Sequence, residues 1–347
     1  MAKHTAPQAS LAGEINTATR ALHAQLNRLI TSRVPFALPP LATDARPYTA
    51  GLVHFAHVFL TFESLWNDVV HDLVPAHAAA GSSPPTSPLL SFLLVNPYAE
   101  PDLFTSPPST HMVAFLHGLR PTGMPRSARL KQDLLQLSGL HPTDLDVMLA
   151  QYPGDKVADF CAHIRRSVAN KPHVLVAYAW CFYMAVFSGG RWIRAQLLRA
   201  GPDFWTSEPR AEGTGAEVAH QGLSLWWFDG DDDGEAIKKA FNERLLEAET
   251  LFTPDQRIDV IEEAKAIFRY CAELVHELDV QLGTDLEQLK HVKAAQRQEP
   301  LPSDDLRTHM VAPKTRQTST WLQRPEVTGA AVALGCLACA VVLRLSL

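Results

Sequence analysis

The stretch HVLVAYAWCFYMAVFSGGRWIRAQLLRA, residues 173–200, decides the fold class. Residues 174–187 are almost unbroken apolar, Ser188-Gly189-Gly190 interrupts the run, and an amphipathic helical pattern resumes at Arg191. Two adjacent glycines cost a helix about 1 kcal/mol each relative to alanine, which indicates a kink or a close approach to the backbone. The stretch predicts one long buried helix bent in its middle. Its glycines serve either as a packing notch or as the surface against which a flat ligand lies.

This pattern of aromatic residues, Ser188-Gly189-Gly190, a polar residue and a renewed amphipathic helix resembles the distal helix of heme oxygenases. In that family the glycines let the backbone pass directly over the heme face. The resemblance covers residues 15–282 with gaps. It implies an all-α, heme-oxygenase-like multi-helical bundle that binds heme, with residues 188–190 on the catalytic, distal side.

A proximal iron ligand is expected near the N-terminus. Residues 15–30 are amphipathic, and the apolar stripe consists of Ile15, Ala18, Leu22, Leu26 and Leu29. His23 lies at the edge of this stripe, and Thr19 precedes it with a spacing that resembles the family's first helix. A lone helical histidine is more often a surface residue than a ligand. Together with the Ser-Gly-Gly helix, the resemblance implies that His23 binds the iron and that Thr19 belongs to the heme site.

Other site residues follow from the resemblance alone. Arg20 and Lys238 match basic positions that hold the heme propionates, and Tyr183 completes the implied cofactor-binding set. The other ring nitrogen of an iron-binding histidine needs a polar partner. Asn27 stands where relatives carry an acidic residue, and Asn242 stands where an arginine is usual.

The distal helix also departs from the family. Relatives carry Arg-Tyr-Leu-Gly-Asp-Leu before Ser-Gly-Gly, whereas residues 182–187 read Phe-Tyr-Met-Ala-Val-Phe. Val186 therefore replaces the aspartate that orders water for proton delivery, and Ala185 replaces the first distal glycine. Valine can neither donate a proton nor order water.

Three functions fit these residues. The first is a heme oxygenase that opens heme to biliverdin, CO and Fe²⁺ with O₂ and electrons from an NADPH-dependent membrane reductase. The second is a non-catalytic heme-binding protein that kept the fold and lost the proton relay. The third is a di-iron or cofactor-free helical enzyme. Glu273-x-x-His276 has the spacing of helical iron ligands, but a di-iron site needs two such elements on neighbouring helices.

Composition narrows the function classes. The chain has 347 residues, of which 46% are hydrophobic, and a net charge of −6. It has no block of Lys and Arg, so a nucleic-acid partner is not expected. The five cysteines are spaced neither as a disulfide framework nor as a zinc site, which indicates reducing cytosol. Residues 1–14 lack the apolar segment of a signal peptide.

The sequence predicts three regions. Residues 1–282 form the helical domain, with a surface insertion at about 75–108 that is rich in Pro, Ser and Ala. Residues 283–326 lose the apolar period and read as a flexible linker. Residues 327–343 carry no charge over 17 positions, which is about 26 Å of helix and close to the thickness of the endoplasmic reticulum bilayer. We expect a C-terminal transmembrane tail anchor in that membrane, with the helical domain facing the cytosol.

Two polar clusters have a structural and a metal-binding interpretation. His54, His57 and His71 follow one side of the helix predicted at residues 48–74, and a solvated polar face is favoured over a metal site. The acidic run at residues 229–235 begins like a calcium loop, but Ala240 stands where a bidentate glutamate is needed. We expect these acids to stabilise the N-terminus of the next helix.

Overall fold

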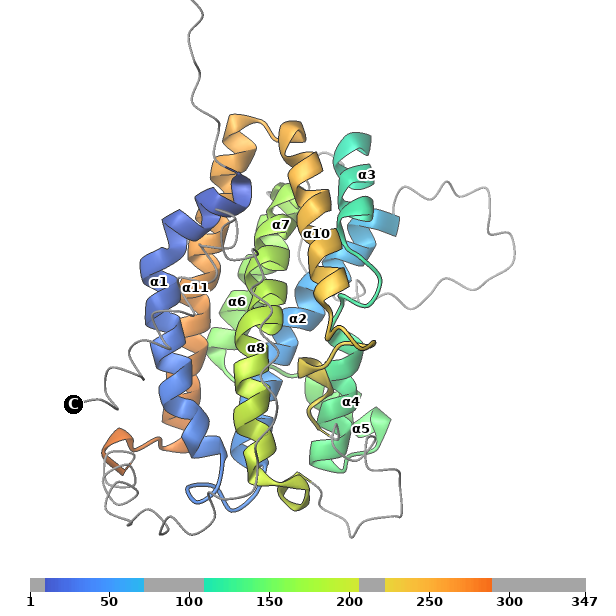
Figure 1. The fold of residues 1–347 in the computed structure, drawn as a ribbon. Coiled ribbons are helices and arrows are strands. Elements are labelled where there is room, and N and C mark those ends of the chain that lie inside the picture. Colours follow the sequence, from blue (N-terminus) through green and yellow to red (C-terminus); the bar gives the residue numbers. More distant parts are fainter. Residues whose placement is uncertain (1–9, 72–108, 206–221, 289–347) are drawn as a thin grey trace, which may run out of the picture. The chain divides into compact units, whose positions relative to one another are not determined.

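The computed structural model describes residues 10–71, 109–205 and 222–288, and this part of the chain consists of helices and turns without a strand. The chain divides into two compact units, Met1–Leu282 and Gly283–Leu347. The main helices lie in the first unit (Figure 1), and they are α1 Leu11–Arg33, α2 Arg46–His71, α3 Thr110–Leu119, α4 Ser127–Ser138, α5 Pro142–Leu149, α6 Asp155–Asn170, α7 Leu175–Tyr178, α8 Met184–Leu197, α10 Glu235–Ala248 and α11 Pro254–Leu282. The all-α fold predicted from the sequence is confirmed.

Helix α1 packs along α11 through an apolar stripe that differs in part from the predicted one. Ile15 and Leu26 are buried as expected, but Ala18 is exposed and Thr19 is buried instead. A buried threonine is tolerated here because its hydroxyl donates to the Ile15 carbonyl oxygen at 2.8 Å. The helix begins at Ser10, whose hydroxyl accepts a hydrogen bond from the Gly13 amide at 3.2 Å.

The centre of the bundle is an aromatic cluster between α2 and the long helix of residues 172–200. Phe62 is fully buried, and its ring stacks on Tyr178 at 5.7 Å and on Phe182 at 5.6 Å between ring centroids. Because α2 also packs on α4 and α6, this cluster holds the long helix in the middle of the domain.

The long helix is continuous from Pro172 to Ala200, and its irregular segment lies before the glycines. Residues Ala179–Tyr183 form a π-helical turn, whereas Gly189 and Gly190 lie within the regular α-helix α8. The bend predicted at the glycines is therefore replaced by a π-turn about two turns earlier, and such turns commonly mark functional helices.

One described helix, Pro172–Ala200, is long and apolar enough to cross a membrane by length and composition. Because 67% of its most apolar window is buried inside the domain, it reads as a core helix. The predicted insertion at 75–108, most of the linker and the predicted tail anchor at 327–343 lie outside the described residues.

The solvated face predicted for the histidines of α2 is wrong. His54 and His57 are 2% and 4% exposed, because α2 is covered there by α6 and α11, and the side chain of His71 lies outside the described residues. His54 Nδ1 lies 2.8 Å from the Ala50 carbonyl oxygen. Burial, followed by the charges of His54 and Arg165, lowers the pKa of His57 to about 4, so this ring is neutral near pH 7.

Candidate functional site

The two glycines of α8 have different surroundings. A Cβ atom on Gly190 would lie 2.8 Å from the ring of Trp226, so this glycine is a packing notch. A Cβ on Gly189 would meet no atom within 4 Å, and Gly189 is exposed. The packing-notch interpretation is therefore confirmed for Gly190, whereas the ligand-face interpretation stays a prediction for Gly189. Gly189 leaves a strip of bare backbone on the open side of the helix.

The open side of α8 continues along the helix. Ala185, Gly189 and Trp192 are exposed and follow each other at spacings of four and three residues, so they share one face. Phe187 on the opposite side is 1% exposed, and Val186 on the flank of this face is 3% exposed. This open face carries small residues over two turns and ends at an aromatic side chain.

The buried side of α8 is held by the segment of residues 222–228. Asp133 of α4 accepts hydrogen bonds from the Ser224 amide at 2.7 Å, the Ser224 hydroxyl at 2.6 Å and the Leu225 amide at 2.7 Å. Next in the chain, the Trp226 indole donates to the Tyr48 hydroxyl at 2.9 Å and covers Gly190. A single buried carboxylate therefore fixes the turn that places Trp226 against the distal helix.

The acidic run at 229–235 binds both α10 and α8. Asp232 accepts a hydrogen bond from the Ala236 amide at 2.7 Å, which confirms the expected role at the helix N-terminus. Asp233 also receives two hydrogen bonds from Arg194, at 2.8 and 2.6 Å, and lies 3.2 Å from Arg191. The Arg194 guanidinium holds the pKa of Asp233 below its usual range. These ion pairs fix the C-terminal half of α8.

His23 lies on the exposed side of α1, partly covered by Phe268 of α11. The two rings meet edge to face, with 5.6 Å between centroids and an interplanar angle of 84°. Partial burial lowers the pKa of His23, which favours the neutral imidazole that can bind a metal. Arg20, one turn earlier, is exposed.

Helices α1 and α8 run in the same direction (Figure 1). A hydrogen bond joins α1 to the π-helical turn that precedes α8. The Trp180 indole donates to the Asn16 side-chain oxygen at 3.1 Å. From that contact, His23 lies seven residues further along α1, about 10 Å, and Gly189 lies nine residues further along the distal helix, about 14 Å. His23 and the bare backbone of Gly189 are therefore at comparable levels of the domain.

The other predicted site residues are dispersed. Tyr183 is 1% exposed and donates to Glu63 Oε1 at 2.8 Å, and Thr19 is buried in the interface with α11, so their surroundings give no support to a cofactor-binding role. Lys238 of α10 is half-buried and lies 3.8 Å from Glu235. Ser188 is half-buried beside Gly189.

The sequence did not identify the buried polar network around Glu63. Its carboxylate accepts hydrogen bonds from Tyr183 and from the backbone amides of Arg126 and Ser127, at 2.8, 2.7 and 3.0 Å. The Arg126 side chain is fully buried and donates to the Trp227 carbonyl oxygen at 2.7 Å. Burial lowers the pKa of Arg126 to about 10. Local sequence patterns cannot predict these contacts, because the hydrogen-bonded partners are 63 to 120 residues apart in the chain.

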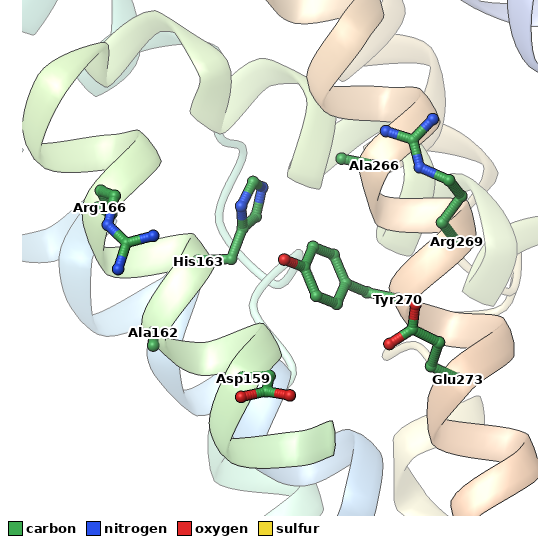
Figure 2. A pocket seen from close by; sticks show the side chains of 8 residues that line it. All are labelled: Asp159, Ala162, His163, Arg166, Ala266, Arg269, Tyr270 and Glu273. Carbon is green, nitrogen blue, oxygen red and sulfur yellow. The ribbon is translucent and has the colours of Figure 1, made fainter. Parts of the chain in front are cut away.

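A groove of about 460 Å³ lies elsewhere, between α6 and α11 (Figure 2). Its floor is Tyr270, which stacks on Phe160 at 4.8 Å, and His163 faces it from α6. His163 Nε2 lies 3.0 Å from Glu263 Oε1, which also accepts a hydrogen bond from Tyr178. Helical spacing places Phe268 on the opposite side of α11 from this groove, so the groove is separate from the His23 region.

The two residues that suggested a di-iron enzyme, Glu273 and His276, lie at or near this groove. Glu273 lines it, and His276 is exposed one turn later. Within the described residues, no group of three or more His, Cys, Asp or Glu side chains is arranged to hold a metal ion. The Glu273-x-x-His276 spacing therefore has no partner element there.

Residues 112–277 match the family model described as heme oxygenase. This range includes α8 with Gly189, but it begins after α1 and so does not contain His23. No curated protein sequence matches this chain. The family match therefore includes the helix with the glycine pair and leaves out the helix with His23.

Two solved structures share the fold. Heme oxygenase 2 from Chlamydomonas reinhardtii, solved without heme, is 17% identical with a TM-score of 0.51, and the match covers 77% of this chain and 97% of that one. Heme oxygenase-2 from Synechocystis sp. PCC 6803, solved with heme and NO, is 14% identical with a TM-score of 0.53, and the match covers 85% and 95%. The chain therefore has the all-α fold of heme oxygenases, and the family model matches just under half of its length.

Asp133 predicts a specific pH dependence of stability. Burial raises the pKa of its carboxyl from 3.8 to about 6, so the folded protein keeps this proton where the unfolded chain has lost it. The contribution of this group to stability is therefore present below pH 4 and is lost as the pH rises to about 6. We expect Asp133→Asn to remove this fall, measured by urea unfolding at pH 4 to 7, whereas the exposed control Asp146→Asn should keep it. Identical pH profiles for Asp133→Asn and wild type would contradict the assignment.

Proposed function

We propose that this chain is a heme oxygenase-like protein that binds heme between α1 and the open face of α8 and opens it oxidatively to biliverdin, CO and Fe²⁺. The observation that carries the proposal is the bare backbone of Gly189, at a level of the domain comparable with that of a neutral His23 on α1. A planar macrocycle needs such a surface, because a side chain at residue 189 would hold it away from the helix.

The residues present fit heme in chemistry. His23 offers a neutral imidazole nitrogen for the iron. Arg20 is an exposed cation on the same helix, and Lys238 is a second cation on α10 that can meet the carboxylates of the ligand at the solvent edge. When bound, heme supplies both the iron at which O₂ is activated and the ring that is opened.

The distal face has little means of moving a proton. Val186 is buried and faces the core, so residues 185, 189 and 192 of the open face include no titratable side chain. The nearest hydroxyl is Ser188 Oγ, which can hold a water molecule beside the glycine backbone. A second function, heme binding without turnover, is favoured by this observation. Electrons for turnover would come from an NADPH-dependent membrane reductase.

Introducing a carboxylate at residue 186 would not test proton delivery alone, because it would also change the stability of the fold. In the sequence, Val186→Asp looks like the restoration of the family residue. In the structure the new carboxylate would be buried among apolar side chains, which costs several kcal/mol unless it is paired. Ser188 is therefore the better position for testing proton delivery.

The glycine pair provides a matched test of the binding face. Gly189→Ala should keep or raise the free energy of unfolding by up to about 1 kcal/mol, because alanine favours the helix and meets no atom. It should weaken hemin binding, because the new methyl group stands between backbone and macrocycle. Gly190→Ala should lower the stability, because its Cβ would meet Trp226 at 2.8 Å. Hemin titration and urea unfolding measure the two effects, and unchanged hemin affinity in Gly189→Ala would exclude this face.

The iron ligand is tested by His23→Ala. We expect the variant to lose the six-coordinate ferric absorption spectrum and to keep its helical circular dichroism, because His23 lies at the edge of the core. The control is His276→Ala, an exposed histidine on α11 that should leave the spectrum unchanged. If His23→Ala keeps the wild-type Soret band, another residue binds the iron.

Turnover separates the two functions. Loss of a positioned proton donor costs about 10²–10⁴ in rate, so we expect slow bilin formation from hemin with NADPH and a reductase, followed by absorbance. Ser188→Ala should slow it further without changing hemin affinity. Bound hemin with no bilin would establish the non-catalytic function, and fast turnover that is insensitive to Ser188→Ala would show another proton route.

We also propose that residues 327–343 anchor the chain in the endoplasmic reticulum membrane, with the helical domain in the cytosol. The support is the charge-free run of 17 residues after a polar linker. Deleting residues 325–347 should release the protein from membranes with its helical circular dichroism intact. Loss of helix content or aggregation of the shortened chain would place this segment in the core instead.

A further inference from the structure

The open face of α8 ends at Trp192, which no part of the proposed function uses. The side chain is 41% exposed, and within the described part of the chain it has no hydrogen bond or ring contact. A single exposed tryptophan is common on protein surfaces. Trp192 differs because it lies three residues after Gly189 and seven after Ala185, on the stripe where the other side chains are a hydrogen atom and a methyl group.

The helical turn that carries Trp192 is fixed on its other side. Arg191 and Arg194, which flank it, both bind Asp233, and Arg194 also lies 4.0 Å from the ring centroid of Trp227. These contacts prevent α8 from rotating about its axis. The indole is therefore held on the open face while much of its surface stays exposed, which is the arrangement of a preformed contact for a ligand.

We propose that Trp192 is a positioning residue that contacts the edge of the bound macrocycle and selects its in-plane orientation. The proposal rests on heme binding at the open face, and it adds the residue that decides which edge of the ring faces the distal helix. A ligand lying on the backbone of Gly189 can rotate about the iron bond, because small residues offer no barrier. An indole at the end of the face makes one rotational position more favourable, through edge contact with the flat ring.

Hemin binding and the proton NMR spectrum of the cyanide-bound ferric protein test this in the full chain. Trp192→Ala should weaken hemin binding roughly three- to tenfold. It should also add a second set of heme methyl signals, because the ligand then occupies more than one orientation. Trp192→Phe should restore a single set. Leu198→Ala is the matched control, because Leu198 is equally exposed at 40% and lies off the stripe.

The outcomes distinguish this inference from the function on which it rests. If Trp192→Ala keeps wild-type affinity and one set of methyl signals while His23→Ala loses the ferric spectrum, Trp192 does not position the ligand but heme binding stands. If Leu198→Ala changes the signals as strongly as Trp192→Ala, the effect is not specific to the open face and the inference is overturned. If the wild-type chain binds no hemin, both proposals fall.

Discussion

The contact of Trp226 with the backbone of Gly190 is the constraint on which the site depends. It closes one side of α8 so tightly that a Cβ on residue 190 would lie 2.8 Å from the indole ring. With that side filled, the helix has one orientation, and Gly189 and Ala185 must face away from the core. The contact is in turn held by the hydrogen bonds of Asp133 and of Tyr48. The open face of α8 is therefore positioned by polar contacts on the other side of the helix.

The same arrangement explains why a valine at residue 186 is compatible with the fold. Val186 is an apolar residue that fills the core beside Phe187, so the bundle gains packing from it. What the chain lacks is a titratable group on the ligand side of α8. In the proposed function, heme binding therefore depends on the bare backbone of Gly189, and proton delivery depends on Ser188.

Much of the fold could be predicted from the sequence, because local apolar periodicity controls it. The pattern predicts the long helix of residues 173–200, the α1 stripe through Ile15 and Leu26, and the helix of residues 254–282. The pattern does not predict that Thr19 is buried in place of Ala18. The threonine can be buried because its hydroxyl makes a hydrogen bond within its own helix. The buried His54 and His57 were missed since their cover comes from α6 and α11, which are distant in the sequence.

The site could be predicted only in part. The glycine pair was recognised, but the different roles of Gly189 and Gly190 depend on Trp226, which lies 36 residues further along the chain. Tyr183 occupies a position that suggests ligand contact, yet a partner 120 residues away draws its hydroxyl into the core. Such long-range hydrogen bonds leave no local pattern.

The most direct test is where heme binds, measured by paramagnetic broadening of amide NMR signals with ferric hemin relative to diamagnetic zinc protoporphyrin. The account predicts that the amides of Ala185, Gly189 and His23 broaden while those of Arg166 and Tyr270, in the groove between α6 and α11, remain sharp. Broadening in that groove with sharp signals at Gly189 would contradict it.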